Sequence, residues 1–213
     1  MIVWGRTTSI NVQRVLWLLS ELNLPFERID LGGKFGGLDA PDYRALNPTG
    51  RIPTLADGSV VVWESNAILR YLAGAYGDAD IWGETWAERA RADMWMEWFQ
   101  NSIYPDFITA FYQCVRLPAS ERDPKKLADA ARILTDAYTQ LDGELQTRSY
   151  VAGDHFTIGD IPVAASLYRY YTMGLDQPDL PALWSYYKRL AARPAYKEII
   201  MTSYDSLRVP EPT

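Results

Sequence analysis

The segment formed by residues 47–71, NPTGRIPTLADGSVVVWESNAILRY, constrains the fold of this chain more than any other. Its first four residues favour a turn. Residues 52–55 are apolar enough for a short strand, and Pro53 restricts that strand to an edge or places the proline at its start, because proline cannot donate to a ladder. The Asp-Gly pair at 57–58 signals a hairpin, and the β-branched and aromatic residues 59–63 are typical of the returning strand. A β-hairpin followed by a helix is therefore predicted.

Glu64 and Ser65 stand at the predicted start of that helix. Free backbone N–H groups and the positive end of the helix dipole favour a carboxylate at such a position. The Ser65 hydroxyl and N–H can donate to a ligand carboxylate, and the Glu64 carboxylate can accept from a ligand ammonium. The pair could therefore bind an α-amino-acid group. The alternative is an ordinary helix cap, which is the role of most such pairs.

The chain before this segment has the pattern of a βαβ unit. Residues 2–4 predict a strand, apolar residues at helical spacing follow over 12–22, and residues 26–31 predict a second strand. This order implies a right-handed crossover between parallel strands. With the hairpin and the next helix, it is the order of a thioredoxin-like sheet. The glycine-rich segment 32–45 predicts a loop with a short helix, and its Lys34 could reach a ligand carboxylate or be an ordinary solvated lysine.

The rest of the chain has a helical pattern. A polar break at residues 77–80 separates it from the first part, and apolar residues recur at helical spacing from Glu84 onward. We therefore predict an α/β thioredoxin-like domain over 1–77 and an all-α bundle over 84–213. Thr157 and Asp160 resemble a capping box at the start of a helix, and we interpret them as structural.

Charge and composition exclude several classes of function. The net charge of −6 and the isoelectric point near 4.9 argue against binding to nucleic acid or to anionic membranes. No apolar run is long enough to cross a bilayer, and the N-terminus lacks a secretory pattern, so a cytoplasmic location is the default expectation. The single cysteine, Cys114, excludes an internal disulfide and a multi-cysteine metal cluster, and no metal is expected. His155 is the only histidine and is interpreted as a structural or surface residue.

The motifs NPTGRIPTL and GSVVVWESNAILRYL resemble the glutathione-binding half of the glutathione transferases, and the resemblance covers almost the whole chain. It implies that Pro53 is cis and that the backbone of Ile52 pairs with the cysteinyl backbone of glutathione. It also implies that Glu64 and Ser65 hold the γ-glutamyl group. Glutathione as the co-substrate and a homodimer follow from the same resemblance.

The family places a hydroxyl or thiol after the first strand, where it donates a hydrogen bond to the glutathione sulfur. Ser9 stands at the position of the serine that theta-like members use. Those members usually have proline and arginine two and four residues later, where this chain has Asn11 and Gln13. Some bacterial members start with a segment similar to WGRTTSINV, so the Asn11 amide is a second candidate donor. We place Ser9 ahead, with both residues open, because a hydroxyl and an amide can each stabilise a thiolate.

In this family the second domain supplies the pocket for the electrophile. The candidates here share an aromatic side chain on a predicted helix, and each could instead belong to the core: Tyr104, Phe107, Phe111 and Tyr168. The function implied is attack of the glutathione thiolate on a small electrophile, with halogenated compounds among the candidates and detoxification as the role. The alternative is a transferase-like binding or scaffold module that has lost catalysis.

Overall fold

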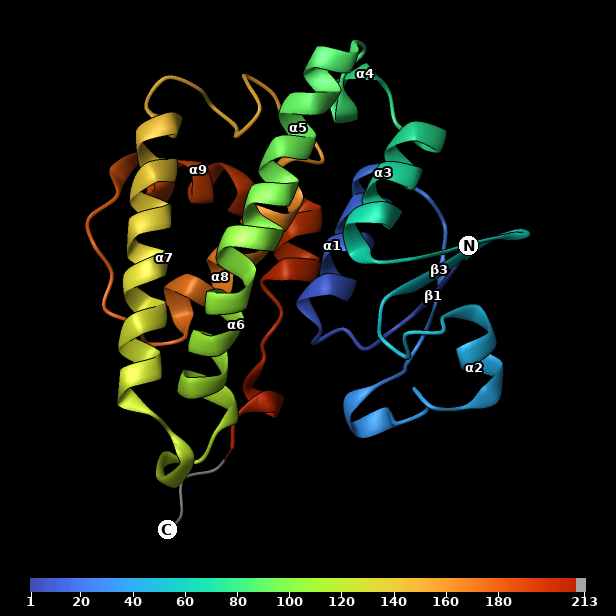
Figure 1. Cartoon of the computed structure of the whole chain (residues 1–213). Coiled ribbons are helices and arrows are strands. Elements are labelled where there is room, and N and C mark those ends of the chain that lie inside the picture. Colours follow the sequence, from blue (N-terminus) through green and yellow to red (C-terminus); the bar gives the residue numbers. More distant parts are fainter. Residues whose placement is uncertain (210–213) are drawn as a thin grey trace.

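The computed structural model describes residues 1–209 and has a small sheet on one side of a larger group of helices (Figure 1). The strands are β1 (Ile2–Trp4), β2 (Glu27–Ile29), β3 (Thr54–Asp57) and β4 (Val60–Trp63), in the order β2-β1-β3-β4. β1 pairs in parallel with β2, while the β1–β3 and β3–β4 pairs are antiparallel. The predicted βαβ unit and the hairpin after it are therefore confirmed.

The hairpin turn lies one residue later than its Asp-Gly signal suggests. Asp57 pairs with Val60, so the two turn residues are Gly58 and Ser59. Gly58 has φ +57°, a left-handed conformation that glycine adopts without steric cost. A two-residue hairpin turn requires a positive φ at its first residue, which explains the glycine at this position.

The helices lie mostly after the sheet. The α/β part contains α1 (Ile10–Glu21), η1 (Gly33–Phe35), α2 (Pro41–Leu46) and α3 (Ser65–Tyr76). The helical part contains α4 (Ala79–Trp82), α5 (Trp86–Trp98), η2 (Phe99–Ile103), α6 (Tyr104–Phe111), η3 (Tyr112–Arg116), η4 (Ala119–Glu121), α7 (Pro124–Leu145), α8 (Asp160–Thr172), α9 (Pro181–Ala191), η5 (Tyr196–Ile200) and η6 (Asp205–Leu207). The predicted fold class, a thioredoxin-like α/β domain followed by a helical domain, is confirmed, whereas the exact boundaries at 77 and 84 stay a prediction.

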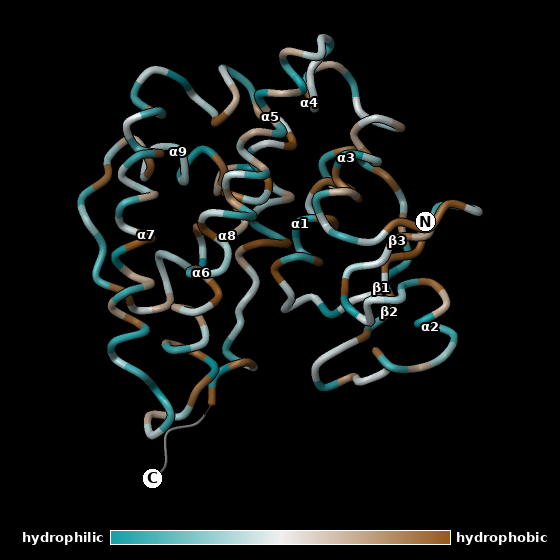
Figure 2. The backbone as a smooth tube through the Cα atoms, in the orientation of Figure 1, coloured by the Kyte–Doolittle hydropathy of each residue, from teal (hydrophilic) through white to brown (hydrophobic). Residues whose placement is uncertain are grey.

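Helix α1 joins the two parts. It packs on α3 beside the sheet and on α8 and η5 of the helical part. Trp17 at its centre is fully buried, and its ring meets the ring of Tyr196 edge-on at a centroid distance of 4.9 Å. Figure 2 shows hydrophobic residues along this junction and a mixed pattern on the outer helix α7. The core is thus continuous through α1, which fixes the end of β1 against the helical part.

Helices α5 and α6 form one continuous rod with a wide turn between them. The five residues of η2 make this turn, and Pro105 lies at the first turn of α6, where a missing N–H is tolerated. A π-type turn adds a residue to the helical repeat and rotates every later side chain about the axis. The helical rod is therefore widened just before Pro105.

The start of α8 is built on a buried carboxyl group. Asp160 is fully buried and accepts hydrogen bonds from the backbone N–H of Thr157 at 2.8 Å and of Val151 at 3.0 Å, and from the hydroxyl of Tyr186 at 2.8 Å. Burial raises the pKa of Asp160 to about 6. The acid of the predicted capping box bonds back to Thr157 as expected, and the residues around it belong to the core.

None of the helices formed by residues 1–209 combines the length and the apolar character that crossing a bilayer requires.

Candidate active site

A loop before β3 is held in shape by buried polar groups. Asn47 is 1% exposed, and its amide donates to the backbone oxygen of Arg51 at 2.9 Å and to the hydroxyl of Thr54 at 3.0 Å. Its carbonyl oxygen accepts from the backbone N–H of Thr49 at 3.0 Å. The Ile52-Pro53 peptide bond that follows is cis, as the resemblance implied. These contacts fix the backbone of Ile52 just ahead of the sheet.

The start of α3 presents two polar groups. Glu64 is its N-cap, with φ +72°, a strained conformation for a residue other than glycine. The Glu64 side chain is exposed and makes no hydrogen bond or ion pair with any other described residue, 1–209. Ser65, the first helical residue, is 5% exposed. Strained residues of this kind cluster at ligand sites, so this turn is a candidate for binding.

The cis-proline loop and the start of α3 line one cavity of about 420 Å³. Among the residues predicted for the site, those that line it are Asn11, Ile52, Pro53, Glu64, Ser65 and Tyr104. The helical part adds Gln100 and Tyr112 to the lining, and the turn after β1 adds Arg6. The cavity is therefore formed by both parts of the molecule, in the size range of small-ligand sites.

Ser9 and Asn11 occupy different places. Ser9 is the N-cap residue of α1 by position, but its hydroxyl makes no capping hydrogen bond. Ser9 is also absent from the described residues that line the cavity. Asn11 does line the cavity, and its amide Nδ2 donates to the hydroxyl oxygen of Tyr104 at 3.0 Å. The Asn11 carbonyl oxygen is buried without a hydrogen-bond partner among the described residues.

The aromatic candidates of the helical part are placed differently from one another. Phe107 is fully buried and stacks on Phe111, with 6.4 Å between ring centroids. Phe111, 2% exposed, also meets the ring of Tyr204 edge-on. Tyr168 is partly exposed and lies near the same Tyr204 ring, at 6.1 Å. These three side chains pack among helices, and Tyr104 is the member of the set that lines the cavity.

Lys34 lies in η1 with its side chain exposed. Its ammonium group sits 5.1 Å from the centroid of the Phe35 ring, and it is outside the lining of the cavity, to which the neighbouring Gly32 and Gly33 contribute. The backbone of this glycine-rich segment, more than its lysine, faces the cavity.

A buried cation lies behind the start of α3. Arg14 of α1 has no exposed surface. Its terminal nitrogen Nη1 donates to the side-chain oxygen Oε1 of Gln100 at 3.1 Å and to the Ser65 hydroxyl oxygen at 3.5 Å. The guanidinium also stacks on the Tyr104 ring at 5.0 Å. Burial lowers the pKa of Arg14 to about 10, which leaves it charged at neutral pH. Within residues 1–209 no carboxylate pairs with it, and its Nε and Nη2 have no hydrogen-bond partner.

Sequence reasoning did not select Arg6, Arg14, Gln100 or Tyr112. Arg6 had one available signal, a basic residue in the turn between a strand and the helix that carries a candidate donor. The other three are single polar or aromatic residues inside helices, and their spacing is equally consistent with a core position.

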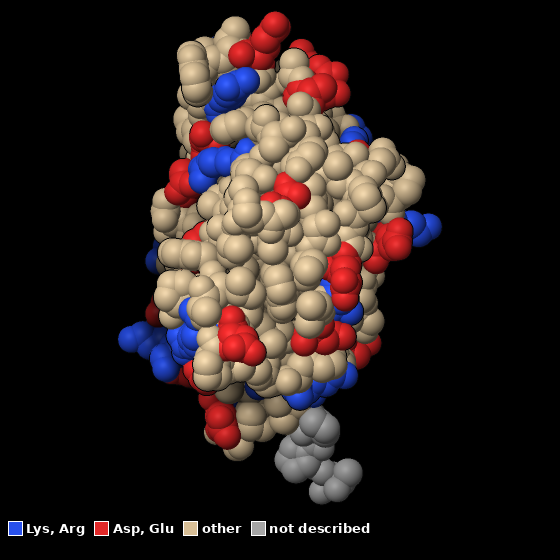
Figure 3. All heavy atoms as spheres, turned by 90° about the vertical axis from the view of Figure 1, so that its right-hand side faces the viewer, with Lys and Arg blue, Asp and Glu red and all other residues tan. Residues whose placement is uncertain are grey.

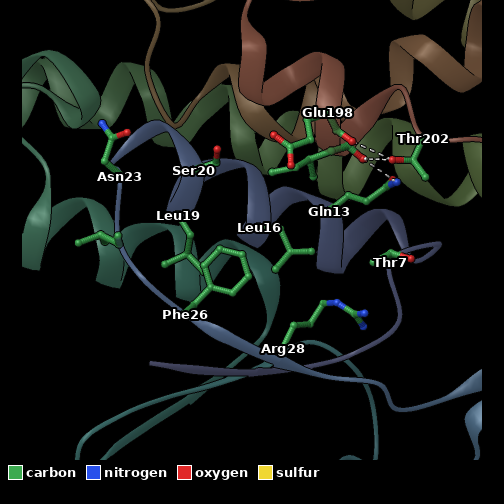
Figure 4. Close-up of a pocket in the computed structure, with 12 residues that line it drawn as sticks. Thr7, Gln13, Leu16, Leu19, Ser20, Asn23, Phe26, Arg28, Glu198 and Thr202 are labelled. Carbon is green, nitrogen blue, oxygen red and sulfur yellow. Dashed lines mark hydrogen bonds between the residues drawn. The ribbon is translucent and has the colours of Figure 1, made fainter.

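A second cavity, of about 440 Å³, lies on another side of α1 (Figure 4). Leu16 and Leu19 of α1 face Phe26 there, while Glu198 and Thr202 approach from the C-terminal segment. The Gln13 amide donates to the backbone oxygen of Ile199 at 3.1 Å and ties that segment to α1. None of the residues predicted for the site is among the described residues that line this cavity.

Comparison with known proteins agrees with the fold. The family model described as "Glutathione S-transferase, N-terminal domain" matches residues 8–75, and that described as "Glutathione S-transferase, C-terminal domain" matches residues 93–194. The chain is 37% identical over 201 residues to glutathione S-transferase GstB of Escherichia coli (strain K12), covering 93% of this chain and 97% of the relative. It is 32% identical to glutathione S-transferase 3 of Zea mays over 212 residues, covering 93% and 92%.

A solved structure is similar over nearly the same length. The theta class glutathione S-transferase from the citrus canker pathogen Xanthomonas axonopodis pv. citri, with glutathione bound, superposes with a TM-score of 0.91 at 42% identity, covering 95% of this chain and 97% of the other. The family-model matches cover both parts of the chain, and the relatives match it almost end to end. The chain therefore belongs to the glutathione S-transferase family, enzymes that use glutathione as a co-substrate.

Proposed function

We propose that this glutathione transferase binds glutathione in the cavity between the cis-proline loop and α3, and that side chains of α1 and α6 stabilise its thiolate for attack on an electrophile. The observation that carries this proposal is the convergence of polar groups with donors or acceptors to spare in one cavity. These are the Glu64 carboxylate, the Ser65 hydroxyl at a helix start, and the Asn11–Tyr104 pair. Their chemistry matches the two ends of the γ-glutamyl-cysteinyl unit.

The start of α3 suits the γ-glutamyl end. The α-carboxylate of the γ-glutamyl group would accept hydrogen bonds from the Ser65 hydroxyl and from backbone N–H groups at the positive end of the helix dipole. The buried Arg14, 3.5 Å from the Ser65 hydroxyl, adds a full positive charge behind them. The Glu64 carboxylate would accept from the ammonium group. The backbone of Ile52 would pair with the cysteinyl unit.

The sulfur would then face the start of α1. Asn11 gives one N–H to Tyr104 and keeps a second N–H, and Tyr104, which accepts from Asn11, keeps its own O–H to donate. Two donors in the cavity support Asn11 and Tyr104 as ligands of the thiolate. Ser9, with its hydroxyl free of a capping bond, is the alternative. A hydrogen bond that favours the charged sulfur lowers the thiol pKa below its ordinary value of about 8.5.

The test is an ultraviolet pH titration of bound glutathione, which follows thiolate absorbance. We expect a thiol pKa well below the free value in the wild-type protein and a return of roughly one unit or more toward it in Asn11→Ala. Ser9→Ala is the paired variant. A shift lost in Ser9→Ala and kept in Asn11→Ala would move the role to Ser9. Binding without any shift would contradict thiolate activation and favour the non-catalytic binding module.

We also propose that two copies of the chain associate. Figure 3 shows a broad face with few charged side chains on the side of the molecule that carries the sheet edge. Apolar side chains exposed on β4 and α5 support this, namely Val60 at 42%, Val61 at 38% and Met94 at 58% exposure. Contiguous exposed apolar surface marks interaction sites. Sedimentation equilibrium should give a dimer for the wild type and a monomer for the Val61→Glu/Met94→Glu variant, and a wild-type monomer would contradict the proposal.

A further inference from the structure

One side chain in the lining of the cavity is an unpaired cation. Arg6 follows β1 in the turn that leads into α1, and it lines the cavity together with Tyr104 and Tyr112. Its terminal nitrogen Nη1 is buried and has no hydrogen-bond partner among residues 1–209. Its side chain makes no ion pair with any described residue. A half-buried guanidinium whose inner nitrogen has no partner keeps donors available for a ligand.

Two arginines of the helical part, Arg116 and Arg169, lie close enough to Arg6 for their charges to interact with its charge. Arg116 of η3 stacks on the Tyr112 ring at 5.1 Å. Arg169 of α8, 3% exposed, donates to the backbone oxygen of Thr8 at 2.9 Å. Burial and then the nearby charge of Arg116 lower the pKa of the Arg6 guanidinium, and the groups that influence it are Arg116 and the two tyrosines, with no carboxylate among them. Burial lowers the pKa of Arg169 to about 10, so it also stays charged at neutral pH.

These three residues, Arg6, Arg116 and Arg169, form an arginine cluster that contrasts with the rest of the molecule. The chain is acidic, with a net charge of −6. Several other arginines in the described part of the chain do meet carboxylates, as Arg70 does with Asp93 at 2.9 Å and Arg193 does with Glu21 at 2.7 Å. Three neighbouring cations without a carboxylate partner therefore make a local positive potential in an acidic protein.

We propose that the electrophile of this transferase carries a carboxylate group, which Arg6 binds in the cavity, with the arginine cluster supplying the attracting field. This inference rests on the proposed function and names the substrate class of the same site. An arginine fork matches a carboxylate with two parallel charge-assisted hydrogen bonds. The rings of Tyr104 and Tyr112 beside Arg6 provide an apolar wall for the body of the substrate.

The chemistry balances without a further reactant. With an aryl chloride as the electrophile, the thiolate sulfur attacks the ring carbon that bears chlorine. The C–S bond forms, the C–Cl bond breaks, and chloride leaves with the bonding electron pair. The thiol proton has already passed to solvent. Positive charge near the ring also stabilises the anionic addition intermediate, so the arginine cluster favours the reaction as well as binding.

Another carboxylate could reach Arg6, namely the glycyl carboxylate of glutathione itself. Arg6 lies close to the glycine-rich segment, since a Cβ placed on Gly33 would be 2.7 Å from its Nε. The two assignments differ in a measurable way. If Arg6 held glutathione, its loss would weaken glutathione binding and would affect every electrophile equally.

The experiment compares 4-chloro-3,5-dinitrobenzoate with the neutral 4-chloro-3,5-dinitrobenzamide, each rate being divided by its uncatalysed rate with glutathione. At saturating glutathione we expect the wild type to favour the benzoate. In Arg6→Gln, kcat/KM for the benzoate should fall about ten- to a hundredfold, the range expected for a charge-assisted pair, with little change for the benzamide. Arg132→Gln, which removes an equal charge from the exposed face of α7, is the matched control and should change neither rate.

Calorimetry on product analogues covers the case in which turnover is slow. S-(carboxymethyl)glutathione should bind more tightly than S-(carbamoylmethyl)glutathione to the wild type, and Arg6→Gln should remove the difference. Equal affinity of the two analogues would overturn the proposal, as would an equal loss for both electrophiles with a raised KM for glutathione. A lowered thiol pKa of bound glutathione alongside either result would leave the proposed function standing, so the two failures are distinguishable.

Discussion

The side-chain amide of Asn11 donates a hydrogen bond to the hydroxyl oxygen of Tyr104 at 3.0 Å. The two residues are 93 positions apart, one at the start of α1 and the other at the start of α6. The bond therefore crosses between the α/β part and the helical part at the wall of the cavity. It also sets the direction of both groups, because the Tyr104 oxygen accepts from Asn11 and its own proton is free to point elsewhere.

The first prediction follows from that free proton. Tyr104→Phe removes one donor from the cavity and should raise the thiol pKa of bound glutathione by about one unit, equivalent to roughly 1.4 kcal/mol. Glutathione affinity should change less, because the Tyr104 hydroxyl is not among the proposed contacts of the γ-glutamyl group. Ultraviolet titration of bound glutathione measures the shift. Tyr112→Phe, which removes another hydroxyl from the same cavity lining, is the control. Equal shifts in both variants would contradict a specific role for Tyr104.

The second prediction concerns the start of α3. Glu64→Gln and Ser65→Ala should each weaken glutathione binding by about 1.5–3 kcal/mol, the range for hydrogen bonds to charged groups. Isothermal calorimetry gives the two dissociation constants. Ser59→Ala, in the exposed hairpin turn, serves as the control and should bind like the wild type. Unchanged affinity in both site variants would contradict the proposal that the γ-glutamyl group binds at this turn.

The third prediction separates binding from stability at Arg14. A buried cation without a carboxylate partner destabilises the folded state until a ligand supplies the opposite charge. Arg14→Met, similar in volume and uncharged, should therefore leave the free energy of unfolding unchanged or raise it, while glutathione affinity falls by about 1–2 kcal/mol. Urea unfolding and calorimetry on the same sample measure the two quantities. A large loss of stability with full affinity would reduce Arg14 to a packing role.

Much of the α/β part could be predicted because its signals are local. The turn residues before Pro53, the Asp-Gly pair and the polar start of α3 each act over a few neighbouring residues, and the structure has the hairpin and the helix in that order. The position of Glu64 and Ser65 at the cavity follows from the same geometry, since a helix start presents its first side chains and N–H groups together.

The wall contributed by the helical part could not be predicted in the same way. Tyr104 and Phe107 are both aromatic residues of α6, yet the first lines the cavity and the second is fully buried. The wide turn η2 rotates all later residues relative to α5. Arg14 reaches Ser65 only because α1 and α3 pack together. Such positions depend on tertiary packing, which spacing along one helix does not contain.

The last prediction concerns Asp160, whose pKa burial raises to about 6, against about 3.9 for an exposed Asp in the unfolded chain. Between these values the folded state binds more protons than the unfolded state, so stability falls as pH rises through this window and is fully retained below it. The loss should be about 2 kcal/mol from pH 4 to pH 7. Urea midpoints followed by tryptophan fluorescence across that range measure it. Asp160→Asn, which cannot titrate, should lack this component of the slope. Identical slopes in the two proteins would place the folded pKa near its ordinary value. A wild type that gains stability with pH relative to Asp160→Asn would mean that the hydrogen bonds from Thr157, Val151 and Tyr186 outweigh desolvation.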